Sequence, residues 1–349
     1  MQSDGKIVIQ GTFGVARFLP DGALDASFGN GGIAHVPFSN VINGAVALQS
    51  DGKILVAGIA GPSSAELFAV ARLNTDGSLD ASFGTDGEVT TSLGFPGVGE
   101  AILEQPDGKI LLGGTVLGGK KQPDRTVLAR YNPDGTLDAS FGRGGTVSVV
   151  SIGGANQLGL DEEGNIFVNL DTGVAEFSST GHLDSQVTPA RITSSSHGGA
   201  TAFQFDGKYV FAETVAVGAA RNHDNDTRVV RFTATGSVDS TFNNPVFDFV
   251  GEGGSGNDDI ADAVAIQPNS KIVVAGWHSH DFENFVFALA RFNPDGSFDS
   301  AFGTKGIVTT KAPDNNGVKA LVVQSDGKIV AIGEANSDTA LALARYLGE

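Results

Sequence analysis

The residues best suited to chemistry stand in one short stretch, residues 276–285, which read GWHSHDFENF. Two of the six histidines lie here, next to an aspartate and the only tryptophan of the chain. An imidazole beside a carboxylate can act as a general base, as in a hydrolase or a lyase. Residues 221–226 (RNHDND) repeat this combination. The candidate catalytic residues are therefore His223, Asp224, His278, His280 and Asp281.

The same stretches could bind a ligand without catalysing its conversion. Aromatic rings stack on sugars or peptides, and imidazoles supply hydrogen bonds. The candidate ligand-binding residues are Trp277, His278, His280, Phe282, His223 and His197. Two alternatives stay open, because Trp277 could pack against its own sheet and the histidines could hold a transition metal.

A calcium site is a further candidate just upstream. Residues 253–261 (GGSGNDDIA) match the calcium-binding nonapeptide GGxGxDxUx. Carboxylate oxygens suit calcium, so the predicted ligands are Asp258, Asp259 and Asp262. Such turns bind calcium between stacked copies, and only one copy is present, so an acidic loop without an ion is the alternative. Calcium is the one cofactor that the sequence suggests, and none is required.

The elements that must position these side chains are sequence repeats. The phrase DGKI occurs at residues 4–7, 51–54, 107–110 and 326–329, with weaker copies at 163–167, 206–209 and 269–272. A second phrase follows, for example ARLNTDGSLDASFG at 71–84. The unit length of roughly 43–63 residues falls within the range of propeller blades.

Each unit divides into four expected strands. In the second unit these are residues 45–49, 53–58, 67–74 and 88–92. Asp-Gly between the first two supplies the positive φ angles of a tight hairpin turn. No helical periodicity is present, and four-stranded sheets bury both faces by stacking around an axis. We therefore predict an all-β fold, a β-propeller.

The whole chain is expected to form one propeller domain, residues 1–349. Its units lie around 1–40, 41–94, 95–150, 151–193, 194–250, 251–311 and 312–349. These predict seven blades of up to four antiparallel strands. The alternative is six blades with a terminal blade shared between the two ends.

These repeats resemble the bacterial delta-60 repeat family, whose units carry the DGKI and LDxSFG phrases. The resemblance covers nearly the whole chain and implies propeller-like repeats of large secreted or surface proteins. It implies no particular activity. We accordingly expect a secreted, cell-surface or periplasmic location, with any signal segment absent from this chain.

Several repeated residues are expected to build the scaffold. Arginines recur on the third strand at Arg17, Arg72, Arg130, Arg231, Arg291 and Arg345. Aspartates follow at Asp25, Asp80, Asp138, Asp184, Asp239 and Asp299. We predict ion pairs within blades, such as Arg72–Asp80, with Glu176 replacing the arginine of the fourth unit. Phe83, Phe141, Phe242 and Phe302 are expected to fill the space between blades.

Composition limits the partners. The formal net charge of −18 argues against nucleic acid and anionic membrane surfaces. The chain has no cysteine, which excludes disulfides, zinc–thiolate sites and thiol catalysis. No apolar run approaches the ~18 residues of a membrane helix.

The loops that differ between units should share one face of the propeller, where recognition or chemistry would lie. The sequence favours a non-catalytic binding or structural module for a glycan, peptide or protein. The alternatives are a hydrolase or lyase with a His/Asp site on that face, and a calcium-stabilised propeller.

Overall fold

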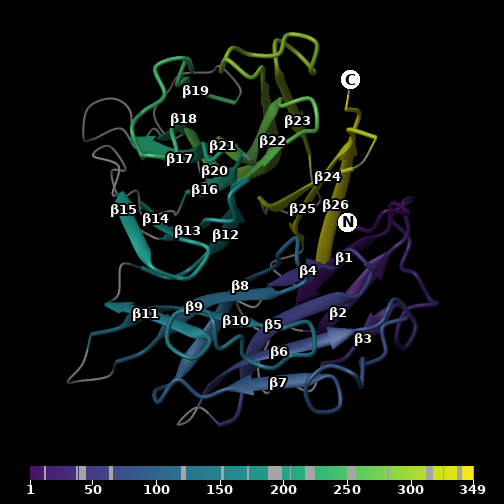
Figure 1. Ribbon diagram of the computed structural model, residues 1–349. Helices are drawn as coiled ribbons and strands as arrows, with labels where there is room; N and C mark the ends of the chain where they lie inside the picture. Colours follow the sequence, from purple (N-terminus) through teal and green to yellow (C-terminus); the bar gives the residue numbers. More distant parts are fainter. Residues whose placement is uncertain are drawn as a thin grey trace. The chain divides into compact units, whose positions relative to one another are not determined.

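The computed structural model describes residues 1–11, 13–36, 38, 45–62, 66–118, 123–150, 153–170, 173–187, 199–204, 206–216, 225–249, 257–280, 283–311, 317–324, 326–335 and 340–348. These residues form 26 strands and no helix, so none of them makes an apolar helix that could cross a membrane. The chain divides into two compact units, Met1–Val187 and Thr188–Glu349, which are described separately (Figure 1). The prediction of one domain over 1–349 stays a prediction.

The first unit contains four antiparallel sheets, each built from strands that are consecutive in the chain. The first has three strands, β1 (Ile7–Gly11), β2 (Gly14–Phe18) and β3 (Ile33–Ala34). The second has β4 (Val46–Leu48), β5 (Ile54–Ala60), β6 (Leu67–Leu73) and β7 (Glu88–Thr91). The third has β8 (Gly97–Glu104), β9 (Ile110–Val116), β10 (Arg125–Tyr131) and β11 (Thr146–Val150). The fourth has β12 (Gln157–Leu160), β13 (Ile166–Leu170), β14 (Gly173–Phe177) and β15 (Leu183–Val187).

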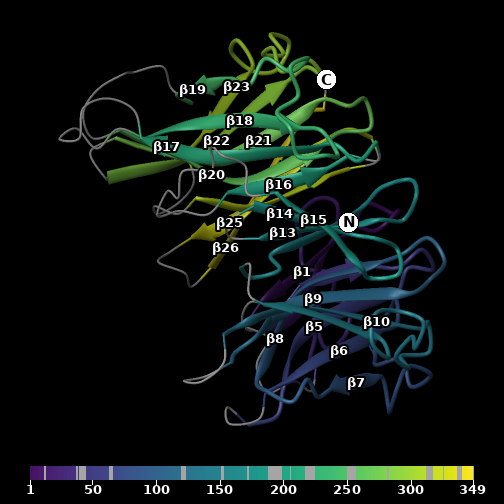
Figure 2. The ribbon, with the colours of Figure 1, turned by 60° about the vertical axis from the view of Figure 1, so that its left-hand side comes forward.

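The second unit contains two further four-stranded groups and a last three-stranded sheet (Figure 2). One group is β16 (Ala200–Phe203), β17 (Tyr209–Ala216), β18 (Asn225–Phe232) and β19 (Val246–Phe247). The other is β20 (Asn257–Ile266), β21 (Ile272–His280), β22 (Glu283–Phe292) and β23 (Ile307–Thr310). A single parallel pair, Asn225 with Asp258, joins the two groups into one sheet. The last sheet is β24 (Val318–Val323), β25 (Ile329–Ala335) and β26 (Ala340–Tyr346).

The all-β propeller prediction is confirmed, but the predicted number of blades is wrong. The described residues form five four-stranded blades rather than seven, or the alternative six. The reason is that the first and last repeats each supply three strands instead of four. The strands expected in the second unit agree with β4–β7 to within two residues at each end.

Local turn chemistry explains why each hairpin forms where it does. In the turn between β4 and β5, Gly52 has φ +86, a conformation that favours glycine. The Asp51 carboxylate accepts a hydrogen bond from the Lys53 amide at 3.0 Å. The Gln49 amide bonds to the Lys53 carbonyl at 2.8 Å and closes the loop. The same bonds recur at the other DGK turns of the described chain, which sets the strand register.

The hydrophobic core lies between the faces of neighbouring blades. Leu55 and Phe68 of one blade pack with Ile102 and Leu112 of the next. Close approach of the blades favours glycine on the second strand, because a Cβ on Gly114 would stand 2.9 Å from Cζ of Phe68 in the preceding blade. Apolar side chains on both faces of each sheet therefore make stacking of the blades favourable.

A repeated joint of charged side chains also connects successive blades. Arg72 Nε donates to Asp80 Oδ2 at 2.7 Å, as predicted, and its Nη1 donates to the Pro133 carbonyl of the next blade at 2.5 Å. Lys53 adds an ion pair to Asp80 at 3.0 Å. The guanidinium lies 4.5 Å from the centre of the Phe83 ring, a cation–π distance.

The joint occurs five times in the described chain. Its ion pairs are Arg17–Asp25, Arg72–Asp80, Arg130–Asp138, Arg231–Asp239 and Arg291–Asp299. The predicted phenylalanines Phe83, Phe141, Phe242 and Phe302 are all buried beneath these arginines. In the fourth repeat Glu176 replaces the arginine, and Asp184 is exposed. The residues that the repeats share therefore hold the scaffold together.

Candidate functional site

Most of the predicted catalytic and ligand-binding residues cannot be placed. His197, His223, Asp224, Asp281 and Phe282 lie outside the described residues. The backbone of His280 ends β21, where it pairs with Asn257 and Glu283. Of the predicted groups, Trp277 and His278 have described side chains. They are neighbours on β21, so they point to opposite faces of that strand.

Trp277 packs against the adjacent sheet. A Cβ added to Gly317, the residue before β24, would lie 2.0 Å from Cδ1 of the indole. The tryptophan is half-buried in this position. Glycine at residue 317 therefore makes room for the ring on the adjacent sheet, whereas the packing alternative considered from the sequence placed it against its own sheet.

His278 lies on the other face of β21 and is buried. Its partner across the strand pair is Asp259 of β20. The Nδ1 atom of His278 is 3.0 Å from Oδ1 of Asp259, within hydrogen-bonding distance. This pairing follows from the register of the β20–β21 hairpin, in which Asp259 and His278, 19 positions apart in the chain, stand directly opposite each other.

The three aspartates predicted to bind calcium lie on β20, but they do not converge. Asp258 and Asp259 are adjacent on the strand and face opposite sides. Asp258 Oδ1 accepts a hydrogen bond from Asn225 Nδ2 at 2.5 Å. Asp262 stands within the register shift between Ala261 and Ala263. The glycine half of the nonapeptide, residues 251–256, is outside the described residues. The strand geometry thus prevents one ion from taking both Asp258 and Asp259.

A different third group approaches the Asp259–His278 pair. Asp248, on the segment that leaves β19, brings a carboxylate oxygen to it, and one ligand atom from each residue lies within 4.8 Å of the others. We call Asp248, Asp259 and His278 the acid–imidazole cluster. Asp248 precedes the predicted calcium ligands in the chain, but nothing in its local sequence distinguishes it from the other acids.

Electrostatics in this cluster favour a bound positive charge. Burial, together with the nearby Asp248 carboxylate and against the lowering effect of His278, raises the pKa of Asp259 to about 6. Oδ1 of Asp259 also accepts a hydrogen bond from the Phe249 amide at 3.3 Å. The Oδ2 atom of Asp259 is buried, and among the described residues none forms a hydrogen bond with it. The cluster can therefore hold a proton or a cation.

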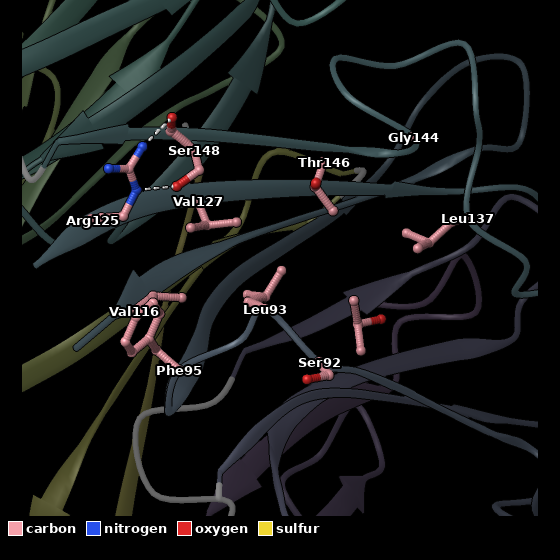
Figure 3. A pocket seen from close by; sticks show the side chains of 11 residues that line it. Ser92, Leu93, Phe95, Val116, Arg125, Val127, Leu137, Gly144, Thr146 and Ser148 are labelled. Carbon is pink, nitrogen blue, oxygen red and sulfur yellow. Dashed lines mark hydrogen bonds between the residues drawn. The ribbon is translucent and has the colours of Figure 1, made fainter. Parts of the chain in front are cut away.

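A groove in the first unit offers a second place for a ligand. It has a volume of about 470 Å³ and lies between the segment after β7 and strands β10 and β11 (Figure 3). We call it the β7–β11 groove. Leu93, Phe95 and Leu137 supply apolar surface, and Phe95 is 47% exposed. Arg125 donates from Nε to Ser148 Oγ at 2.5 Å and from Nη2 to the Ser148 carbonyl at 2.9 Å (Figure 3).

A groove at the corresponding place exists in the second unit. It has a volume of about 630 Å³ and is lined by Asp248, Phe249, Lys305 and residues of β23. Lys305, Ile307 and Thr309 in this groove stand at the repeat positions that Gly144, Thr146 and Ser148 occupy in the groove of the first unit. Asp248 lines this groove and also belongs to the acid–imidazole cluster. The sequence analysis missed both grooves, because each combines side chains of two successive repeats.

Solved structures of similar fold include several enzymes and proteins of unknown function. An α-L-arabinanase from Penicillium chrysogenum, complexed with arabinobiose, is 12% identical, with a TM-score of 0.50 over 86% of this chain and 91% of that chain. A periplasmic gluconolactonase from Pseudomonas aeruginosa is 12% identical, with a TM-score of 0.47 over 99% of both chains. A Bacteroides caccae protein of unknown function is 15% identical, with a TM-score of 0.40 over 76% of this chain and 98% of that chain. At such identities the likeness to the arabinanase shows the fold alone.

Comparison of the sequence with curated proteins finds no match. A family model described as a domain of unknown function (DUF5122) beta-propeller matches residues 2–28, 49–83, 105–141, 204–242, 267–302 and 324–348. Most of these segments run from a DGK turn to the phenylalanine of the joint, and the fourth repeat, with Glu176, is not matched. The delta-60 name stays a prediction. Because this family model matches more than half of the residues in the chain, the chain belongs to the DUF5122 beta-propeller family.

Proposed function

We propose that this propeller is a non-catalytic binding module that takes an oligosaccharide in the β7–β11 groove. The observation that supports this most directly is the groove itself, which combines an exposed aromatic ring with fixed polar groups. Its volume of about 470 Å³ falls within the range of ligand sites. Phe95 would stack on the apolar face of a sugar ring.

The polar groups of the groove suit a hydroxyl-rich ligand. Arg125 is held by two bonds to Ser148 through Nε and Nη2, which leaves Nη1 to donate to a ligand. Ser92 and Thr146 add hydroxyl groups that can donate and accept. A peptide would use the apolar surface as well, but the hydroxyls and the guanidinium match the alternating polar and apolar faces of sugars more closely.

Binding is preferred to turnover because of the surroundings of His278. Its ring is buried, and Nδ1 lies at hydrogen-bonding distance from Asp259. The buried ring offers little accessible surface to a polymeric substrate. A hydrolase or lyase centred on His278 is therefore the weaker candidate.

The proposal includes location and partners. The acidic chain, with a net charge of −18, suits a secreted or cell-surface protein that meets glycans outside the cell. The proposed function includes neither nucleic-acid binding, which favours basic segments, nor membrane insertion, which needs long apolar segments.

The test is a glycan array followed by calorimetry with the best ligand. Arabino-oligosaccharides belong in the array because the arabinanase of similar fold is complexed with arabinobiose. Phe95→Ala should weaken binding by about 1–2 kcal/mol, roughly 5- to 30-fold, from lost stacking and burial. Val150→Ala is the matched control, since Val150 is 57% exposed on β11 but does not line the groove. Equal affinities of the two variants, or no glycan retained, would reject the proposal.

A further inference from the structure

Three chain segments of the second unit meet at the acid–imidazole cluster. Asp259 and His278 face each other across the β20–β21 hairpin, and Asp248 arrives from the segment after β19. The group therefore lies where the blade of β16–β19 meets the blade of β20–β23. None of these three residues is repeated in the other units, so the scaffold does not require them.

The carboxylate of Asp259 lacks part of its hydrogen bonding. The side chain is 1% exposed, and Oδ1 has two partners, the Phe249 amide and His278. Within the described part of the chain, Oδ2 has no hydrogen-bonding partner. A buried carboxylate oxygen without a partner is unfavourable, and a second carboxylate nearby adds repulsion. A cation would satisfy Oδ2 and remove that repulsion.

We propose that Asp248, Asp259 and His278 bind a divalent transition-metal ion such as Zn²⁺ or Mn²⁺. One ligand atom from each residue lies within 4.8 Å of the others, and small side-chain rotations would bring the three around one ion at ordinary metal–ligand distances of about 2.0–2.2 Å. Two carboxylates and an imidazole form a mixed oxygen and nitrogen set, which suits these ions. The groove lined by Asp248 provides a path by which the ion and its water ligands enter.

The ligand set distinguishes this site from the calcium site expected from the sequence. Calcium takes six to eight oxygen ligands, whereas this cluster contributes an imidazole. Asp258 faces the opposite side of β20 and is bonded to Asn225, so it is not a ligand. The inference is independent of the oligosaccharide proposal, which uses none of these residues.

The experiment uses the full chain, freed of metal with EDTA and titrated calorimetrically with Zn²⁺, Mn²⁺, Ca²⁺ and Mg²⁺ salts. We expect one ion per chain, tighter binding of Zn²⁺ or Mn²⁺ than of Ca²⁺, and a rise in Tm with metal. Asp259→Asn and His278→Gln should each weaken binding at least about tenfold. Asp258→Asn is the matched control and should bind like the parent.

A second measurement separates loss of the site from loss of the fold. Co²⁺ bound to the parent chain should show visible absorption typical of mixed oxygen and nitrogen ligands. That spectrum should change in His278→Gln, whose folding is checked by circular dichroism. The inference is wrong if no ion binds at one per chain, if Ca²⁺ binds more tightly than Zn²⁺ and Mn²⁺, or if Asp258→Asn loses as much affinity as Asp259→Asn.

Discussion

Replacement of Arg72 by methionine tests whether the repeated joint holds neighbouring blades together. Arg72 is buried and bonds to Asp80 in its own blade and to the Pro133 carbonyl in the next one. Methionine fills a similar volume and keeps contact with the Phe83 ring, so the change removes mainly the charge and its hydrogen bonds. The perturbation is therefore electrostatic rather than a loss of packing.

The expected magnitude follows from what each partner loses. The Pro133 carbonyl loses a charged donor, a cost of about 1.5–3 kcal/mol. Asp80 is not left alone, because Lys53 lies 3.0 Å away and Ser82 donates from Oγ at 2.7 Å. The stabilisation that Asp80 loses with Arg72 should therefore be smaller than the roughly 3–5 kcal/mol of a broken buried ion pair. Together with the lost cation–π contact, we expect destabilisation of about 3–5 kcal/mol.

Urea unfolding, followed by fluorescence and circular dichroism, measures the change. Arg143→Met is the matched control, because it removes the same charge from an exposed side chain and should change stability by about 0.5 kcal/mol or less. Arg72→Lys should fall between the two, because a single ammonium cannot serve both Asp80 and Pro133. A loss below about 1 kcal/mol in Arg72→Met, or equal losses in the two methionine variants, would show that the joint does not stabilise the fold.

Two further predictions concern the same joints. Hydrogen bonds from the Ser140 hydroxyl and amide, together with Arg130, hold the pKa of Asp138 at about 2, below its ordinary value of 3.8. A folded pKa below the unfolded one means that this stabilisation is present above about pH 4 and is lost as the pH falls toward about 2. Asp138→Asn should therefore flatten the dependence of the urea midpoint on pH in that window, and an unchanged slope would contradict the assignment. Gly135→Ala should destabilise the fold more than Gly144→Ala. Both glycines have positive φ, so the backbone strain is shared. The Cβ added at Gly135 meets Val89 Cγ2 at 2.7 Å, whereas the Cβ added at Gly144 meets nothing within 4 Å. Thermal melting of both variants tests this, and equal values of Tm would show that the blades yield at this contact.

Much of the fold could be predicted because the decisive signals are local. The Asp-Gly turn between β4 and β5 and the alternating residues around it specify a hairpin through neighbouring backbone groups. The same holds for Arg72 and Asp80, which are eight residues apart on a strand and the turn that follows it. Interactions over such short separations depend on backbone conformation that the residues themselves favour.

The candidate site was predicted only in part. His278 and Asp259 were both selected, but for different sites, and their direct pairing comes from the register of the β20–β21 hairpin. Asp248 joins them from a separate strand connection, and Asp258 is directed away by alternation along β20. Residue type alone could not separate these three aspartates, because their roles depend on which face of a strand they occupy.

By itself, the sequence determined the all-β class, the repeating hairpins and the Arg–Asp pairs, since all of these arise from contacts within one repeat. Tertiary structure decided the number of complete blades, the packing of Trp277 on Gly317, and the meeting of Asp248 with Asp259 and His278. These features join different repeats or strand faces. They depend on how sheets stack and in which register their strands pair, and neither is written in any short stretch of residues.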